Sequence, residues 1–173
     1  MQKIITKKFV IPISVLGLVG MLVAYQVIFA ADTATVAATV TVQNISLSVA
    51  DGAVAYGALA SNTTKSTCTT ELNDLQIITN DGNVAETFNI KGQNSVDWTL
   101  AATAGSNQYV EKFATSTCAT WGTGAALTLS YATAATNIAV SATSSLNLQI
   151  NTPNPSTIFT QQSVDVLLQA VAY

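Results

Sequence analysis

Histidine and arginine are both missing from this chain, and only 9% of its residues are charged. Without histidine, neither a Ser-His-Asp nor a Cys-His nucleophile arrangement can form. The nine acidic residues are scattered singly, so no pair of carboxylates stands out for glycoside hydrolysis. The sequence also has no Ser-x-x-Lys pair and no glycine-rich phosphate-binding loop. We therefore expect a protein that is not an enzyme and uses no organic cofactor.

Positive charge is scarce as well, because the chain has six lysines and three of them precede an apolar segment. The three lysines beyond that segment face nine acids, which leaves a formal charge of −6. Nucleic-acid binding requires clustered lysine or arginine, and so does electrostatic binding to an anionic membrane surface. The charge balance therefore excludes nucleic acid as a partner and gives no support for electrostatic attachment to lipid.

The longest apolar run extends from Phe9 to Ala31 and comes after Lys3, Lys7 and Lys8. Lysines in front of such a run keep that end in the cytoplasm, so the chain beyond the run is expected to be exported. The small residue Ala30 suits cleavage, which makes residues 1–30 a signal peptide. The run is also long enough to cross a bilayer, so a retained anchor through residues 9–31 stays open. Both interpretations place residues 31–173 at the cell surface or outside the cell.

The two cysteines, Cys68 and Cys118, are too few for a four-cysteine zinc site, and no histidine can complete one. In an exported domain the pattern favours one disulfide between them. Two free thiols, or pairing between subunits, are the alternatives.

Thr and Val are abundant after residue 31, and apolar residues alternate with polar ones in many short runs. A period of two is typical of strands, and about nine such runs separated by turn residues indicate an all-β sandwich. Examples are the runs at 36–42, 56–59, 84–91 and 163–171. We expect residues 31–173 to form a single immunoglobulin-like β-sandwich domain.

The stretch Asn80-Asp81-Gly82-Asn83 lies between two of these runs. Because Asn, Asp and Gly tolerate the positive φ of tight turns, it is predicted to be a β-hairpin turn. Its oxygen-bearing side chains, with Asp74 and Glu86 nearby in sequence, also allow a calcium site formed by Asp74, Asp81 and Glu86. The alternation places Glu86 on the face of Phe88, near the rim of the sandwich.

Two tryptophans are candidates for binding a ligand such as a sugar. Trp98 alternates with Val96 and Leu100, which favours a place in the core. Trp121 precedes Gly122 in a predicted loop and is the better surface candidate for ligand binding.

Three stretches, TNDGNVAETFNIKG (79–92), SVDWTL (95–100) and QQSVDVLLQAVAY (161–173), together resemble secreted immunoglobulin-like modules of bacterial and archaeal surface proteins. Among these, the CARDB-like β-sandwich families are the most similar. The resemblance implies a single sandwich domain with an adhesive, structural or spacer role and no catalytic residues.

These observations predict an exported structural or adhesive protein whose partner is a protein or a glycan at the cell surface. One alternative is a filament subunit that self-associates by adding residues 33–43 (TATVAATVTVQ) to a neighbour's sheet. In the simpler interpretation these residues are the domain's own first strand. A calcium-dependent carbohydrate-binding module is a further alternative.

Overall fold

The computed structural model describes residues 32–173, so the predicted signal peptide (1–30) and the apolar segment 9–31 lie outside the described residues. Contacts divide the chain into two units, Met1–Val40 and Thr41–Tyr173. Between residues 32 and 173, no helix is long and apolar enough to span a membrane.

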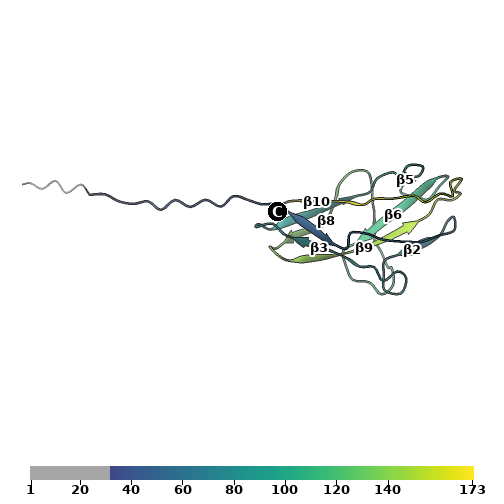
Figure 1. The fold of residues 1–173 in the computed structure, drawn as a ribbon, viewed down its shortest axis with the longest axis horizontal. Helices are drawn as coiled ribbons and strands as arrows, with labels where there is room; N and C mark the ends of the chain where they lie inside the picture. Colours follow the sequence, from purple (N-terminus) through teal and green to yellow (C-terminus); the bar gives the residue numbers. More distant parts are fainter. Residues whose placement is uncertain (1–31) are drawn as a thin grey trace, which may run out of the picture. The chain divides into compact units, whose positions relative to one another are not determined.

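The unit Thr41–Tyr173 is built from strands, and the part of the chain from residue 32 onward contains no helix (Figure 1). The strands are β1 (Leu47–Ala50), β2 (Thr64–Ser66), β3 (Gln76–Asn80), β4 (Glu86–Lys91), β5 (Thr99–Leu100), β6 (Gln108–Ala114), β7 (Ala125–Ala126), β8 (Ala132–Ile138), β9 (Thr143–Asn151) and β10 (Leu167–Ala172). The all-β prediction is confirmed.

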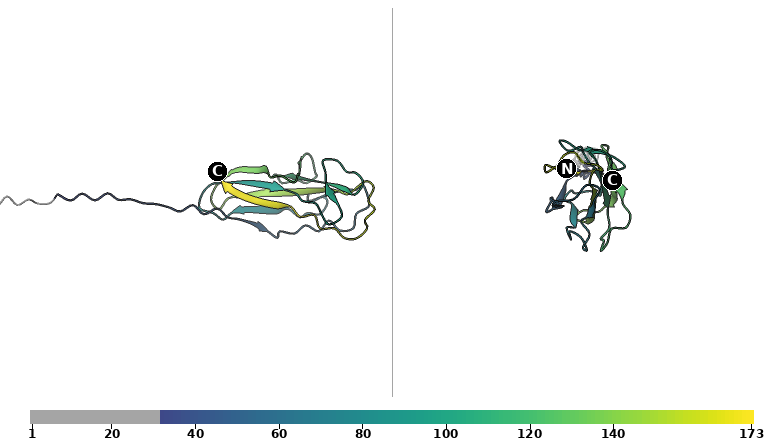
Figure 2. Two further views of the ribbon diagram at one scale, coloured as in Figure 1. Left: turned by 90° about the horizontal axis from the view of Figure 1, so that it is seen from above. Right: turned by 90° about the vertical axis from the view of Figure 1, so that its right-hand side faces the viewer.

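The strands form two sheets, and the larger one has seven strands. Its main order is β1-β3-β9-β6-β5, while β2 also pairs with β9 and β7 with β6. The second sheet has the order β10-β4-β8. All strand pairs are antiparallel except β5 with β6. The longer strands of both sheets lie roughly along one common axis (Figure 2).

One hydrophobic core is shared by the two sheets. Burial alternates strictly along β3 and β4, as the period-two pattern predicts. The larger sheet contributes residues such as Ile78, Tyr109 and Leu148, and the smaller one contributes Phe88 and Ile90. Each fully buried aliphatic or aromatic side chain stabilises the fold by about 1.5–3 kcal/mol relative to exposure. This shared core gives the two-layer arrangement that a sandwich requires.

Three of the predicted strands are absent or shorter in the structure. Residues 36–42 form no strand, and Val36, Val40 and Val42 are 88%, 91% and 81% exposed. The run at 56–59 is also outside any strand. The last strand begins at Leu167 rather than at residue 163. In all three cases the side-chain alternation is present but the backbone has no strand beside it to pair with.

The predicted hairpin at residues 80–83 is wrong. The connection does link β3 to β4, but β3 pairs with β1 and β9, whereas β4 pairs with β10 and β8. It therefore crosses from one sheet to the other, and none of its residues has a positive φ. This stretch forms a corner of the fold rather than a tight turn within a sheet.

Candidate functional site

Two long segments without regular structure border one side of the sandwich. The first, residues 52–61, comes after β1, and the second, residues 157–166, leads into β10. Within residues 32–173, no backbone–backbone hydrogen bond reaches any residue from Ala53 to Ala60 or from Phe159 to Asp165. The carbonyls of Ala53, Tyr56 and Ala60 accept hydrogen bonds from side chains. The other backbone groups in these two ranges have no partner among the described residues, so a further strand could pair with them.

A groove with a cavity volume of about 1060 Å³ lies between these two segments. Its floor contains core side chains of β9, namely Leu146, Leu148 and Ile150, each of which is at most 6% exposed. Val49 of β1 and Leu168 of β10 line it as well, so it reaches the outer strands of both sheets. We call it the inter-sheet groove. Along this side, side chains of the two irregular segments, such as Val54 and Val164, pack against the core.

The inter-sheet groove has one buried acidic group, Glu111, which is only 2% exposed. The Tyr56 hydroxyl from the segment 52–61 donates a hydrogen bond of 3.1 Å to Glu111 Oε1. Burial raises the pKa of Glu111 to about 8, although the hydrogen bond from Tyr56 acts in the opposite direction. Burial and the neighbouring Glu111 also raise the pKa of Tyr56 far above its usual value. At neutral pH both groups are therefore predominantly uncharged.

The corner Asn80–Asn83 fixes the chain just before β1. The Asn83 side chain accepts a hydrogen bond of 2.7 Å from the Asn44 amide and donates one of 2.8 Å to the Val42 carbonyl. Glu86 Oε1 accepts a hydrogen bond of 2.8 Å from the Ser46 amide. These bonds hold residues 42–46 against the domain at a defined point.

Glycine is required at position 82 by close packing. A Cβ atom there would collide with the Asn44 carbonyl and with Glu86 Oε1. We expect Gly82→Ala to lower the free energy of unfolding by roughly 1–3 kcal/mol, because overpacking moves the fixed backbone of residue 44. Gly122→Ala is the matched control, since nothing lies within 4 Å of its Cβ position and its φ is not positive. Urea denaturation of both variants measures the difference, and equal losses would contradict this explanation.

The three predicted calcium ligands do not come together. Asp74 precedes β3 and accepts a hydrogen bond from the Gln76 side chain, whereas Asp81 lies beyond the other end of that strand and is exposed. Glu86 is fully buried, contrary to the expected place near the rim. Among residues 32–173, no group of three or more acidic, cysteine or histidine side chains is arranged to hold a metal.

Cys68 and Cys118 form a disulfide with a Cα–Cα distance of 5.2 Å, as the sequence predicts.

The two tryptophans lie in different surroundings. Trp98 is half-buried; it packs against the core, as predicted, and it also lines the inter-sheet groove. Trp121 is half-buried, and its ring lies so close to Gly124 that a Cβ atom there would collide with it. Trp121 lines neither the inter-sheet groove nor the smaller cavity beside β6 and β9. Its ligand-binding role stays a prediction.

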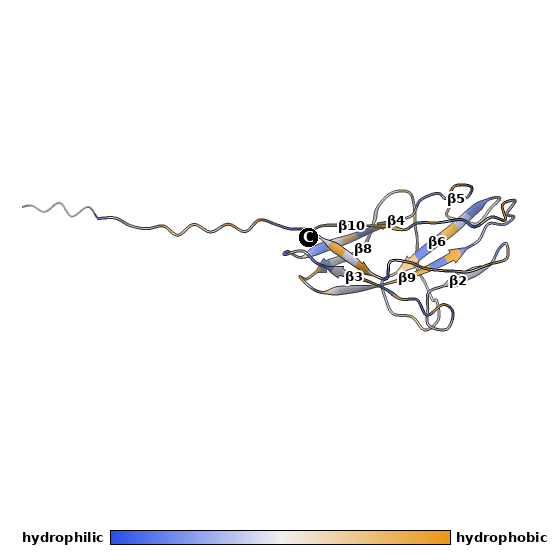
Figure 3. Cartoon of the chain, in the orientation of Figure 1, coloured by the Kyte–Doolittle hydropathy of each residue, from blue (hydrophilic) through white to orange (hydrophobic). Residues whose placement is uncertain are grey.

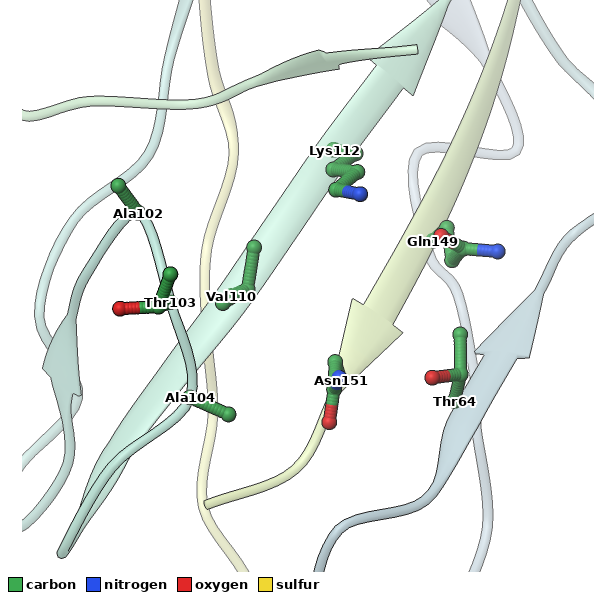
Figure 4. A pocket seen from close by; sticks show the side chains of 8 residues that line it. All are labelled: Thr64, Ala102, Thr103, Ala104, Val110, Lys112, Gln149 and Asn151. Carbon is green, nitrogen blue, oxygen red and sulfur yellow. The ribbon is translucent and has the colours of Figure 1, made fainter. Parts of the chain in front are cut away.

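A second cavity of about 260 Å³ lies beside β6 and β9 (Figure 4). Thr64, the segment Ala102–Ala104, Val110, Lys112, Gln149 and Asn151 line it. Lys112 is its only ionisable group, so this cavity offers no acid–base pair and no cluster of metal ligands.

Sequence reasoning did not identify the inter-sheet groove or Glu111. The groove depends on residues about one hundred positions apart, which no local pattern connects. One local signal was present: Glu111 stands between Tyr109 and Phe113 on the inward face of a predicted strand. An acid in that position indicates a buried carboxyl group.

The fold and the groove define an all-β, two-layer domain with an open side and no recognisable catalytic constellation in residues 32–173. Comparison with known proteins adds no narrower class: no protein-family model, curated protein or solved structure matches the chain.

Proposed function

We propose that the protein is an exported, non-catalytic structural subunit of a cell surface, built on an immunoglobulin-like β-sandwich. Copies assemble into a filament by strand addition through residues 33–43. The disulfide is weakly consistent with an extracellular location, because cytosolic proteins seldom keep one. The lysines and the apolar run at the N-terminus support export.

One observation carries the assembly proposal: residues 33–43 alternate like a strand but lie outside both sheets. Val36, Ala38, Val40 and Val42 share one face of the alternation, and every residue from Thr33 to Gln43 is exposed. The alternation is visible in the hydropathy colouring of this segment (Figure 3). An exposed, uncharged, strand-forming segment readily pairs with a free sheet edge of another chain.

The assembly test replaces residues 33–43 with a glycine–serine linker of the same length in the full chain. Electron microscopy and size-exclusion chromatography of the native protein should show long polymers, and the linker variant should remain monomeric. Because the segment is exposed in the isolated chain, the thermal midpoint of the monomer should change by no more than about 2 °C. Polymers that persist in the linker variant would refute strand addition through residues 33–43. A native protein that stays monomeric would refute assembly and favour an adhesive role with a protein or glycan partner.

Export is tested separately by N-terminal sequencing of the protein recovered from its native envelope. A mature start at Ala31 leaves residues 33–43 close to a free end, whereas an intact Met1 or Gln2 means anchoring through residues 9–31. Recovery of the uncleaved chain from the cytosol would refute the proposal of export.

A further inference from the structure

Strand addition requires an acceptor, and the described residues offer several free strand edges. β1 pairs only with β3, β10 only with β4, β8 only with β4, and β5 only with β6. The edges of β1 and β10 differ from the others, because both border the inter-sheet groove through Val49 and Leu168. The two irregular segments continue these edges along the groove. A strand that enters there has backbone partners available on both sides.

The groove walls and the donor contain similar numbers of residues. Residues 52–61 and 157–166 are ten residues each, and the segment 33–43 has eleven. At about 3.3 Å per residue, an extended segment of this length spans roughly 36 Å. An extended donor therefore has about as many backbone groups as either wall.

The side chains match as well. One face of the donor consists of Val36, Ala38, Val40 and Val42 together with Ala34, while the opposite face is mainly threonine. The groove is lined by half-buried apolar side chains of its two walls, such as Val54, Leu59 and Val164. The three valines of the donor can be removed from water against these side chains. The threonine face would then remain in water, as on the outer side of a sandwich.

Building on the proposed function, we propose that the inter-sheet groove is the acceptor site for residues 33–43 of a second copy of this chain. The valine face of the donor packs against the half-buried apolar side chains of the groove walls. Its backbone pairs with the free edges formed by residues 52–61 and 157–166. The hydrogen bonds of Asn83 to Val42 and Asn44 fix where the donor segment leaves its own domain.

The first test compares two substitutions that introduce the same charge on opposite faces of the donor. Val40→Asp places a carboxylate against the apolar side chains of the groove walls, whereas Thr39→Asp directs it to solvent. We expect Val40→Asp to reduce polymer yield at least about tenfold, because an unpaired charge is buried, and Thr39→Asp to change it less than about twofold. Sedimentation of the full-length proteins provides the measurement. Equal effects of the two variants would overturn the proposal that the valine face of the donor faces the groove.

The second test locates the acceptor by mixing two variants of the full chain, each of which carries one added cysteine besides the native Cys68–Cys118 disulfide. One copy carries Val40→Cys, and the other carries Ala58→Cys in the groove wall or, as a control, Thr136→Cys on the exposed edge strand β8. A disulfide-linked dimer is expected with Ala58→Cys and not with Thr136→Cys. Non-reducing electrophoresis and peptide mass spectrometry identify the linked residues.

The outcomes separate the acceptor site from the proposed function. Polymers whose cross-links join Val40→Cys to Thr136→Cys would preserve assembly by strand addition but overturn the groove as acceptor. A chain carrying both Val40→Cys and Ala58→Cys that cross-links within a monomer would show that the segment fills its own groove. Absence of polymers in the native protein, with no cross-link between copies, would overturn both proposals.

Discussion

Removing the Cys68–Cys118 disulfide is expected to lower the free energy of unfolding by about 4 kcal/mol. The bridge closes a loop with a sequence separation of 50 residues, and the chain-entropy model gives about this value for a loop of that length. The effect is a large fraction of the 5–15 kcal/mol that stabilises a typical domain. Urea denaturation of the Cys68→Ala/Cys118→Ala double variant, monitored by circular dichroism, measures the loss.

Reduction of the native protein provides the control for this prediction. A reducing agent should shift the native midpoint close to that of the double variant and leave the variant unchanged. The bridge also holds the loop after β2 beside residues 115–120, where the Thr70 amide donates a hydrogen bond of 3.0 Å to the Ala119 carbonyl. A loss below about 1 kcal/mol would contradict the expectation, because these local bonds would then suffice to keep the loops together.

The fold class could be predicted from the sequence because alternation reports which side of a strand is buried. Along β4, for example, Phe88 and Ile90 are inward and fully buried, as the pattern requires. Alternation does not report whether a neighbouring strand exists. Residues 36–42 have an equally clear pattern, yet the described structure provides no strand beside them. Pairing depends on contacts distant in sequence, so local periodicity could not separate the two cases.

The corner at residues 80–83 shows a similar limit. Its composition predicts a tight turn, since Asn, Asp and Gly favour such turns. In the structure, Asn80 is instead fully buried and donates hydrogen bonds to the Val84 and Ile138 carbonyls. Gly82 is there because the chain before β1 packs directly on it. These reasons lie in tertiary packing and are absent from the local sequence.

The candidate site was the least predictable part of the molecule. Neither wall of the inter-sheet groove contains an unusual motif, and each is rich in small or polar residues that are ordinary in loops. The groove exists because β1 ends at Ala50 and β10 begins only at Leu167, while the segments next to them stay unpaired. The donor segment, by contrast, was visible in sequence as an uncharged alternating run. The sequence alone therefore indicates the donor segment, whereas the inter-sheet groove is visible only in the fold.

Glu111 provides the second large prediction, because its carboxyl group is buried in the floor of the groove. Its pKa is raised from 4.5 to about 8, mainly through desolvation. In the unfolded chain this group ionises near its ordinary pKa, while the folded protein keeps it protonated to a higher pH. The folded state therefore binds the extra proton between about pH 4.5 and pH 8, and its stability falls as the pH rises through that window.

Glu111→Gln should remove this dependence while retaining an acceptor for the Tyr56 hydroxyl. We expect the stability of the native protein to fall by roughly 2 to 4 kcal/mol relative to the variant between pH 4.5 and pH 8. Urea denaturation of both proteins at several pH values gives the difference, in which the other ionisable groups largely cancel. Asp51→Asn, which alters an exposed acid, should behave like the native protein throughout. Parallel pH profiles for the native protein and Glu111→Gln would show that water reaches the carboxylate and that the floor of the groove is not dry.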